Sequence, residues 1–178
     1  GHRALLGRLK TVAGQAGLQP TVLTFEPHPR EFFDPESAPA RLSTLREKLE
    51  LVADEGVALA YIGRFDAQFA AWSAENFIDR VLVDCLRVKH LIVGDDFNFG
   101  AGRRGNFAML QAAGRTAGFT VEAVGSVMLG DERVSSSGVR AALAEGRLEH
   151  AARLLGRPYS IDGRVVHGGR ALREGGRL

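Results

Sequence analysis

The segment His90-Leu91-Ile92-Val93-Gly94-Asp95-Asp96-Phe97-Asn98-Phe99-Gly100 decides the fold class. It begins as a short, mostly apolar β-strand that ends at Gly94, and a polar loop follows the strand directly. Short apolar strands of this kind are typical of a parallel sheet that is covered on both faces. In such sheets, the loops at the carboxyl ends of the strands form the ligand crevice. The segment therefore predicts an α/β fold and places a loop at the ligand-binding edge of its sheet.

Strand and helix patterns alternate along the rest of the chain. Strands are expected over 20–25, 57–62 and 119–124, and helices over 3–16, 44–54, 74–86 and 106–117. Ser43 and Ser73 are expected to cap two of these helices, and Gly17 to end the first. The alternation predicts a doubly wound parallel sheet.

The pattern changes near Arg157. Residues 159–166 alternate between polar and apolar side chains as a β-strand does, and the tail from Gly168 to Leu178 is rich in glycine and arginine. This stretch is too short to be a domain. We therefore expect an α/β domain over 1–157, followed over 158–178 by the truncated beginning of a small β module.

The composition excludes several classes of protein. The chain has 45% hydrophobic and 25% charged residues, as globular domains do, and its net charge of +2 argues against non-specific nucleic-acid binding. No apolar run approaches the roughly 20 residues that span a bilayer, and no signal-peptide core is visible. The single Cys85 lies in an apolar run and is expected to be a packed helical residue. We expect a cytoplasmic protein without nucleic-acid or membrane partners; its oligomeric state stays open.

The loop after the deciding strand carries the first candidate binding residues. Its glycines allow a close approach to a ligand. The paired carboxylates of Asp95 and Asp96 suit a magnesium ion or a ribose, and Arg103 suits a phosphate. The alternative is a structural loop that Phe97 and Phe99 anchor.

Three serines precede a further predicted helix. Ser135, Ser136 and Ser137 lie where the first helical turn leaves backbone amides without helical partners, and such amides attract phosphate. Arg140 is expected one turn further along, on the same face. The alternative is that these serines are caps without any ligand.

The loop Phe25-Glu26-Pro27-His28-Pro29-Arg30 follows the strand over 20–25. Its two prolines are expected to exclude both helix and strand pairing. The His28 imidazole would then sit on a stiff loop, where an aromatic ligand can stack on it. The alternative is a rigid turn with a solvated histidine.

The other histidines differ in their expected functional roles. His2 falls at the start of the first helix, where the helix dipole and an imidazolium together would stabilise a phosphate. His90 and His150 are expected to have no function, and His167 belongs to the tail. No cluster of cysteine and histidine has the spacing of a metal site, so none is predicted.

Four segments in this order resemble the bacterial bifunctional riboflavin kinase/FAD synthetases: Gly1-His2, Phe25 to Pro29, Val93 to Gly100, and Val134 to Arg140. The segment from 163 to 168 is similar to the start of that family's kinase module. The resemblance covers nearly the whole chain, and it implies a Rossmann-like nucleotidyltransferase fold.

The resemblance also marks where this chain departs from the family. Gly1-His2 would be the second half of a His-x-Gly-His signature, whose first histidine, together with a central strand, is expected upstream of residue 1. Ser137 takes the place of the threonine in a Ser-Ser-Thr-x-x-Arg element. The family's Gly-Phe-Pro-Thr-Ala-Asn kinase segment is absent after His167-Gly168, so no kinase activity is expected of this chain.

The resemblance implies adenylyl transfer, in which the phosphate of FMN attacks the α-phosphorus of ATP and gives FAD and pyrophosphate, with Mg²⁺ arriving on ATP. The implied catalytic residues are His2, Ser136, Ser137 and Arg140. The implied ATP-binding residues are Gly1, His2, Gly94, Asp96, Asn98, Ser135, Ser136, Ser137 and Arg140. The implied flavin-binding residues are Phe25, Pro27, His28, Pro29, Arg30, Phe97, Phe99 and Arg103.

Two other functions remain open. One is another nucleotidyltransferase of the same fold, acting on a pantetheine or nicotinamide phosphate, although the histidine loop and the tail beyond Tyr159 argue against it. The other is an inactive module that binds a nucleotide or flavin.

Overall fold

Two pairs of parallel strands form the centre of the molecule. The computed structural model describes residues 1–163. In it, β1 (Thr21–Glu26) pairs with β2 (Leu59–Arg64), and β3 (His90–Gly94) pairs with β4 (Thr120–Val124), both in parallel register. The predicted α/β class with parallel strands is confirmed. The single predicted sheet is seen as two separate two-stranded sheets within the described residues.

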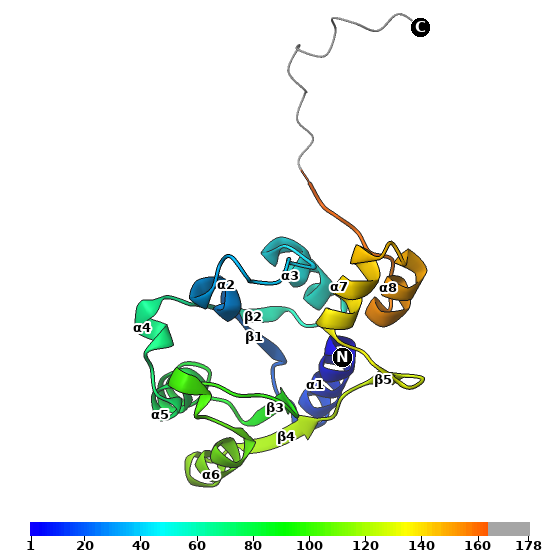
Figure 1. The fold of residues 1–178 in the computed structure, drawn as a ribbon. Helices are drawn as coiled ribbons and strands as arrows, with labels where there is room; N and C mark the ends of the chain where they lie inside the picture. The colour runs from blue at the N-terminus through cyan, green and yellow to red at the C-terminus, as the bar shows by residue number, and fades with distance from the viewer. Residues whose placement is uncertain (164–178) are drawn as a thin grey trace, which may run out of the picture.

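Helices flank the strands on two sides (Figure 1). On one side lie α5 (Ala74–Phe77), its continuation η1 (Ile78–Cys85) and α6 (Phe107–Ala117). On the other side lie α1 (His2–Ala16) and α3 (Leu45–Asp54).

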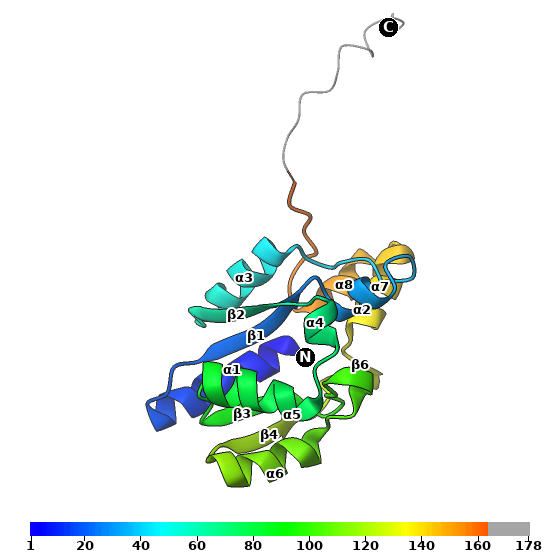
Figure 2. The ribbon, with the colours of Figure 1, turned by 90° about the vertical axis from the view of Figure 1, so that its left-hand side faces the viewer.

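The remaining elements follow the carboxyl ends of the strands, on the right of Figure 2. They are α2 (Pro29–Phe33), α4 (Ala67–Ala70), η2 (Ala101–Arg103), the hairpin of β5 (Met128–Leu129) and β6 (Glu132–Arg133), α7 (Ser136–Ala144) and α8 (Leu148–Leu155). This edge is the one at which α/β sheets bind ligands.

Short polar side chains set the helix starts. Ser73 caps α5 as predicted, because its hydroxyl accepts a hydrogen bond from the backbone N–H of Asn76. The cap of α3 is Thr44 and not Ser43. The reason is local: Glu47 stands three residues after Thr44, and its carboxylate accepts the Thr44 N–H at 2.6 Å, which completes a capping box.

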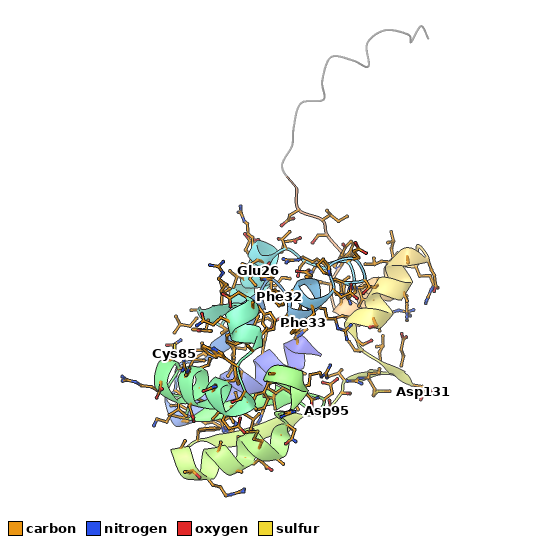
Figure 3. All side chains as sticks on the ribbon, turned by 60° about the vertical axis from the view of Figure 1, so that its left-hand side comes forward. Glu26, Phe32, Phe33, Cys85, Asp95 and Asp131 are labelled. Carbon is orange, nitrogen blue, oxygen red and sulfur yellow. The ribbon has the colours of Figure 1, made fainter. Side chains whose placement is uncertain are left out.

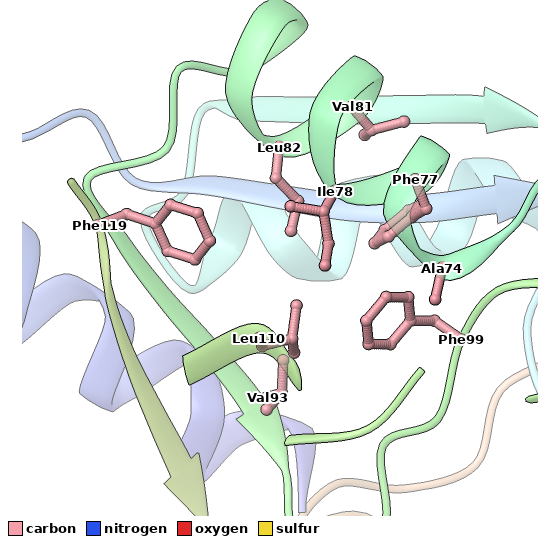
Figure 4. Packing of buried hydrophobic residues seen from close by; sticks show 9 residues of the cluster. All are labelled: Ala74, Phe77, Ile78, Val81, Leu82, Val93, Phe99, Leu110 and Phe119. Carbon is pink, nitrogen blue, oxygen red and sulfur yellow. The ribbon is translucent and has the colours of Figure 1, made fainter. Parts of the chain in front are cut away.

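The hydrophobic core lies among α5, η1, α6 and β3 (Figure 4). It consists of Ala74, Phe77, Ile78, Val81, Leu82, Val93, Phe99, Leu110 and Phe119. Leu110 is 0% exposed and Leu82 is 1% exposed, so α6 and η1 bury their apolar faces against each other. The core therefore fixes the position of β3, which leads into the candidate binding loop.

Cys85 is exposed, which corrects the prediction of a packed helical cysteine. The reason is the winding of η1, a π-helix in which the N–H of Leu86 bonds to the carbonyl of Val81, five residues earlier. The wider turn brings Leu86 onto the core after Val81 and Leu82, and it leaves Cys85 outside.

Charged side chains tie α1 to three other elements. The Arg8 guanidinium donates to both carboxylate oxygens of Glu122 on β4, at 2.7 and 2.9 Å. Arg3 donates to Glu55, at the end of α3, at 2.6 Å and to the carbonyl of Gly156, at the end of α8, at 2.9 Å. These contacts fix the amino end of α1 relative to the rest of the molecule.

The last described residues, 158–163, contain no strand. Most of the predicted β module, including His167, lies outside the part of the chain that the structure describes. Among residues 1–163, none of the helices has the length and apolar content that crossing a bilayer requires.

Candidate active site

The amino ends of α1 and α7 lie together. A Cβ added to Gly1 would be 3.9 Å from the carbonyl oxygen of Val134, two residues before the start of α7, and Figure 1 shows the amino terminus beside α7. The first turn of each helix has unpaired N–H groups and a partial positive charge. Two such turns side by side suit a phosphate group.

His2 is the first residue of α1. Desolvation is the main cause that lowers the pKa of His2, and the positive charge of Lys48 lowers this pKa further. The imidazole is therefore neutral at pH 7. A neutral ring offers an N–H donor at the helix start.

Lys48, on α3, is a further cation near His2. Its ammonium donates to the hydroxyl of Thr24 on β1 at 3.4 Å. Its charge also contributes to the lowered pKa of both His2 and His28. Sequence analysis missed Lys48, because a lysine in a helix carries no sign of the direction in which it points.

The three serines have different roles at the start of α7. Ser135 is the N-cap, and its hydroxyl accepts the N–H of Gly138 at 3.1 Å. Ser136 and Ser137 are the first two helical residues and are exposed. Arg140 is half-buried one turn later, and its Nε donates to the carbonyl of Ala40 at 2.7 Å. The hydroxyls at 136 and 137 thus remain open to a ligand.

The cap at Ser135 leads to a test that separates its structural role from a ligand role. Ser135→Ala is expected to reduce the free energy of unfolding by about 1 kcal/mol, because the Gly138 N–H loses its partner. Ser136→Ala should change stability by less than about 0.5 kcal/mol. Chemical denaturation of both variants measures this. Equal stability losses would show that Ser135 is not the decisive cap.

The loop after β1 turns into the short helix α2. His28 caps this helix: its Nδ1 accepts the N–H of Arg30 at 3.2 Å, and Glu31 accepts the N–H of His28 at 3.2 Å. Pro29 occupies the first helical position, where a missing N–H costs nothing. This corrects the expectation that the prolines exclude a helix. Pro27, His28 and Arg30 are exposed at this corner.

Partial desolvation of the ring is the largest cause of the lowered pKa of His28, and the charges of Lys48, Arg30 and Arg140 also act to lower it, while Glu31 acts in the opposite direction. The imidazole of His28 is therefore neutral at pH 7. Lys48 contributes to the lowered pKa of both histidines, so the start of α1 and the loop after β1 both lie within reach of its charge.

Aromatic rings gather beside this loop. The ring of Phe65 lies 5.5 Å from that of Phe32, 5.7 Å from that of Phe33 and 6.0 Å from that of Phe25. Phe33 is 67% exposed, and Figure 3 shows it with Phe32 near Glu26, at the end of β1. Sequence analysis named Phe25 and missed the others, although the Phe-Phe pair directly after the proline loop was an available signal.

The loop after β3 joins the start of α7 through an ion pair. The carboxylate of Asp96 lies 3.1 Å from the Arg133 guanidinium on β6, two residues before the cap of α7. The amide of Asn98 donates to the carbonyl of Asp96 at 2.8 Å and braces the loop. A Cβ on Gly94 would lie 3.3 Å from the Asp96 carboxylate, so this loop folds back over the end of β3.

The two phenylalanines of this loop are stacked, with ring centroids 5.5 Å apart. Phe99 is 8% exposed and packs against Phe77 of the core. Gly105 is needed beneath it, because a Cβ there would come within 2.6 Å of its ring. Phe99 is thus a core residue, which corrects its place among ligand-facing rings. Phe97 is half-buried and Arg103 is exposed.

Two surface hollows lie away from these residues. The larger, about 400 Å³, is formed between α6 and β4, and the smaller, about 170 Å³, lies between the end of η1 and the end of α6. Both are lined by Phe119, which precedes β4, so both lie at the amino ends of the strands. Among residues 1–163, no three metal-binding side chains are grouped to hold an ion.

Comparison with known proteins identifies the family. The family model described as FAD synthetase matches residues 1–138. A bifunctional riboflavin kinase/FMN adenylyltransferase from Escherichia coli K12 is 51% identical over 168 residues, which are 94% of this chain and 54% of that protein. The protein of the same name from Pseudomonas fluorescens is 49% identical over 98% of this chain and 56% of its own length. The chain thus spans about half the length of these relatives.

A solved structure has the same fold. It is a macrolide-efflux protein from Streptococcus pneumoniae, with a TM-score of 0.77 and 26% sequence identity. The match covers 95% of this chain and 56% of that one. The FAD synthetase family model covers residues 1–138, most of the present chain, and the chain therefore belongs to the FAD synthetase family.

Proposed function

We propose that this chain is the part of a longer enzyme that transfers the adenylyl group of ATP to FMN, giving FAD and pyrophosphate. The observation that carries the proposal is the meeting of two helix starts, α1 and α7, beside the cations Lys48 and Arg140. A triphosphate is the part of these substrates that needs such a concentration of positive charge. Family membership supports the choice of FMN as the acceptor.

The reaction needs alignment and charge stabilisation more than covalent help from the protein. An oxygen of the FMN phosphate forms a bond to the α-phosphorus while the bond to the pyrophosphate oxygen breaks, so negative charge grows on pyrophosphate. In this proposal, the hydroxyls of Ser136 and Ser137 and the guanidinium of Arg140 bind the β- and γ-phosphates. His2 and the first amides of α1 bind near the α-phosphorus, and Lys48 adds a positive charge.

The flavin would lie beside the loop after β1. The exposed ring of Phe33 and the neighbouring Phe32 and Phe65 offer apolar surface for the isoalloxazine ring, with His28 at its margin. The loop after β3, through Asp96 and its neighbours, would line the adenosine. Mg²⁺ would enter bound to ATP and neutralise part of the phosphate charge.

The finer features of the fold belong to the same proposal. The two parallel strand pairs would be parts of one doubly wound sheet, and a boundary near 157 would separate this domain from the beginning of a riboflavin kinase-like module. The proposal includes a cytoplasmic location and excludes nucleic-acid partners and any kinase reaction by this chain.

A stoichiometric assay tests the proposed reaction. We expect the protein, when given FMN and Mg·ATP, to release one pyrophosphate for every FAD formed, and to release none when FMN is left out. The pyrophosphate is measured with a coupled enzyme and FAD by chromatography. Binding of both substrates without pyrophosphate release would indicate an inactive binding module. Adenylylation of a pantetheine or nicotinamide phosphate in place of FMN would indicate a different transferase.

A further inference from the structure

Arg41 joins two carboxylates at the corner where β1 ends. Its Nη2 lies 2.5 Å from Glu26 Oε1, on the last residue of β1, and its Nε donates to Glu31 Oε1, in α2, at 2.6 Å. Nη2 also contacts the second carboxylate oxygen of Glu31. One planar guanidinium thus holds the two ends of the proline-containing corner together. No sequence motif singled out Arg41.

The same arginine reaches His28 through Glu31. The Glu31 carboxylate that binds Arg41 also accepts the backbone N–H of His28, and the hydrogen bond from Arg41 is the main cause of the lowered pKa of Glu31. Glu31 is ionised at neutral pH, and the lowered pKa keeps it ionised, with both contacts, in more acidic solution as well. The orientation of the His28 loop depends on this carboxylate, and the carboxylate depends on Arg41.

Ala40, the residue before Arg41, contacts the proposed phosphate side of the site. The carbonyl of Ala40 accepts the hydrogen bond from Arg140 Nε at 2.7 Å. Ala40 and Arg41 are consecutive in the chain, so one peptide unit lies between the arginine of α7 and the corner that carries His28. The segment that includes them spans the distance between the proposed phosphate and flavin sides.

We propose that Arg41 is a positioning residue. It holds the loop after β1, beside which the flavin would lie, in the orientation that FMN needs relative to the ATP side of the site. The inference rests on the proposed function, because FMN is the ligand whose binding Arg41 would affect. Arg41 itself touches neither phosphate nor flavin; it acts through Glu26, Glu31 and the backbone of His28. Without it, the two carboxylates would repel each other and the corner would lose its fixed geometry.

The test compares substitutions at Arg41 for their effect on FMN binding. Arg41→Ala in the full-length protein is expected to raise the dissociation constant of FMN about tenfold, measured by quenching of flavin fluorescence, and to raise the KM for ATP less than about twofold. Arg41→Lys should recover only part of the loss, because an ammonium cannot bind two carboxylates with a planar fork.

Arg46→Ala is the matched control. Arg46 is also an arginine that pairs with a glutamate, Glu50, at 2.8 Å, but its side chain is 88% exposed on α3. FMN binding by this variant should equal that of the parent protein.

Three outcomes would overturn the inference: unchanged FMN binding in Arg41→Ala, full recovery in Arg41→Lys, or equal losses for FMN and ATP accompanied by a lower Tm. The last would mean that Arg41 only stabilises the fold. Failure of the proposed function can be distinguished from failure of this inference. A parent protein that binds FMN but forms no FAD would refute the proposed reaction, and the comparison of FMN binding among the variants would remain valid.

Discussion

Arg140→Ala is expected to lower kcat/KM for FMN adenylylation about a hundredfold, with the fold intact. The reason is that Arg140 is half-buried one turn into α7, where a charge-assisted hydrogen bond to the departing pyrophosphate is only weakly screened by solvent. In the structure its Nε bonds to the Ala40 carbonyl, and a triphosphate oxygen would bind the Nη groups of the same guanidinium. Pyrophosphate release at saturating and limiting ATP measures the effect.

Arg147→Ala is the control for this experiment. Arg147 follows the same helix, pairs with Glu145 at 2.7 Å and is half exposed, so its removal should leave turnover within about twofold of the parent. Circular dichroism and Tm show whether each variant is folded. Unchanged turnover in Arg140→Ala would remove the phosphate assignment of this residue.

His2→Ala is expected to reduce kcat by about a hundredfold, because the reaction would lose a donor at the point where charge develops. The pH dependence gives a second readout. The pKa of His2 is lowered, so the ring is neutral at pH 7, and a bound triphosphate would raise this pKa by its negative charge. ATP should therefore bind more tightly as the pH falls through the interval between the two pKa values.

The measurement is the ATP dissociation constant between about pH 5 and 8, the range in which histidines titrate. An NMR titration of the imidazole accompanies it. His28 also titrates, so His28→Ala serves as the comparison variant. If the parent and His2→Ala show the same pH dependence of ATP binding, His2 does not contact the triphosphate.

Local chemistry explains why much of the fold was predictable. Ser73 and Gly17 mark helix ends through contacts within a few residues, so these ends follow from the sequence. The cap at Thr44 was missed by one residue, although Glu47 three positions later was a sufficient signal. The winding of η1 was not predictable from the apolar pattern, because that pattern is compatible with an α-helix.

The candidate site was predictable only where a motif carried it. The serines and Arg140 lie at a helix start, as their order in the chain indicates. Phe99 was assigned to the ligand side because a loop phenylalanine needs a surface, and nothing local shows that this surface is the core. Lys48 and Arg41 were missed since their roles come from contacts across long stretches of chain, with Thr24 and Glu26 respectively.

The single cysteine offers a practical consequence. Cys85 is exposed at the end of η1, before β3, and therefore at the opposite edge of the strands from the helix starts. Because Cys85 is the single cysteine among residues 1–178, a thiol-reactive fluorophore or spin label attached to this stretch marks one position. Such a probe would report rotational motion or self-association, and it would lie at the opposite edge from the proposed substrate site.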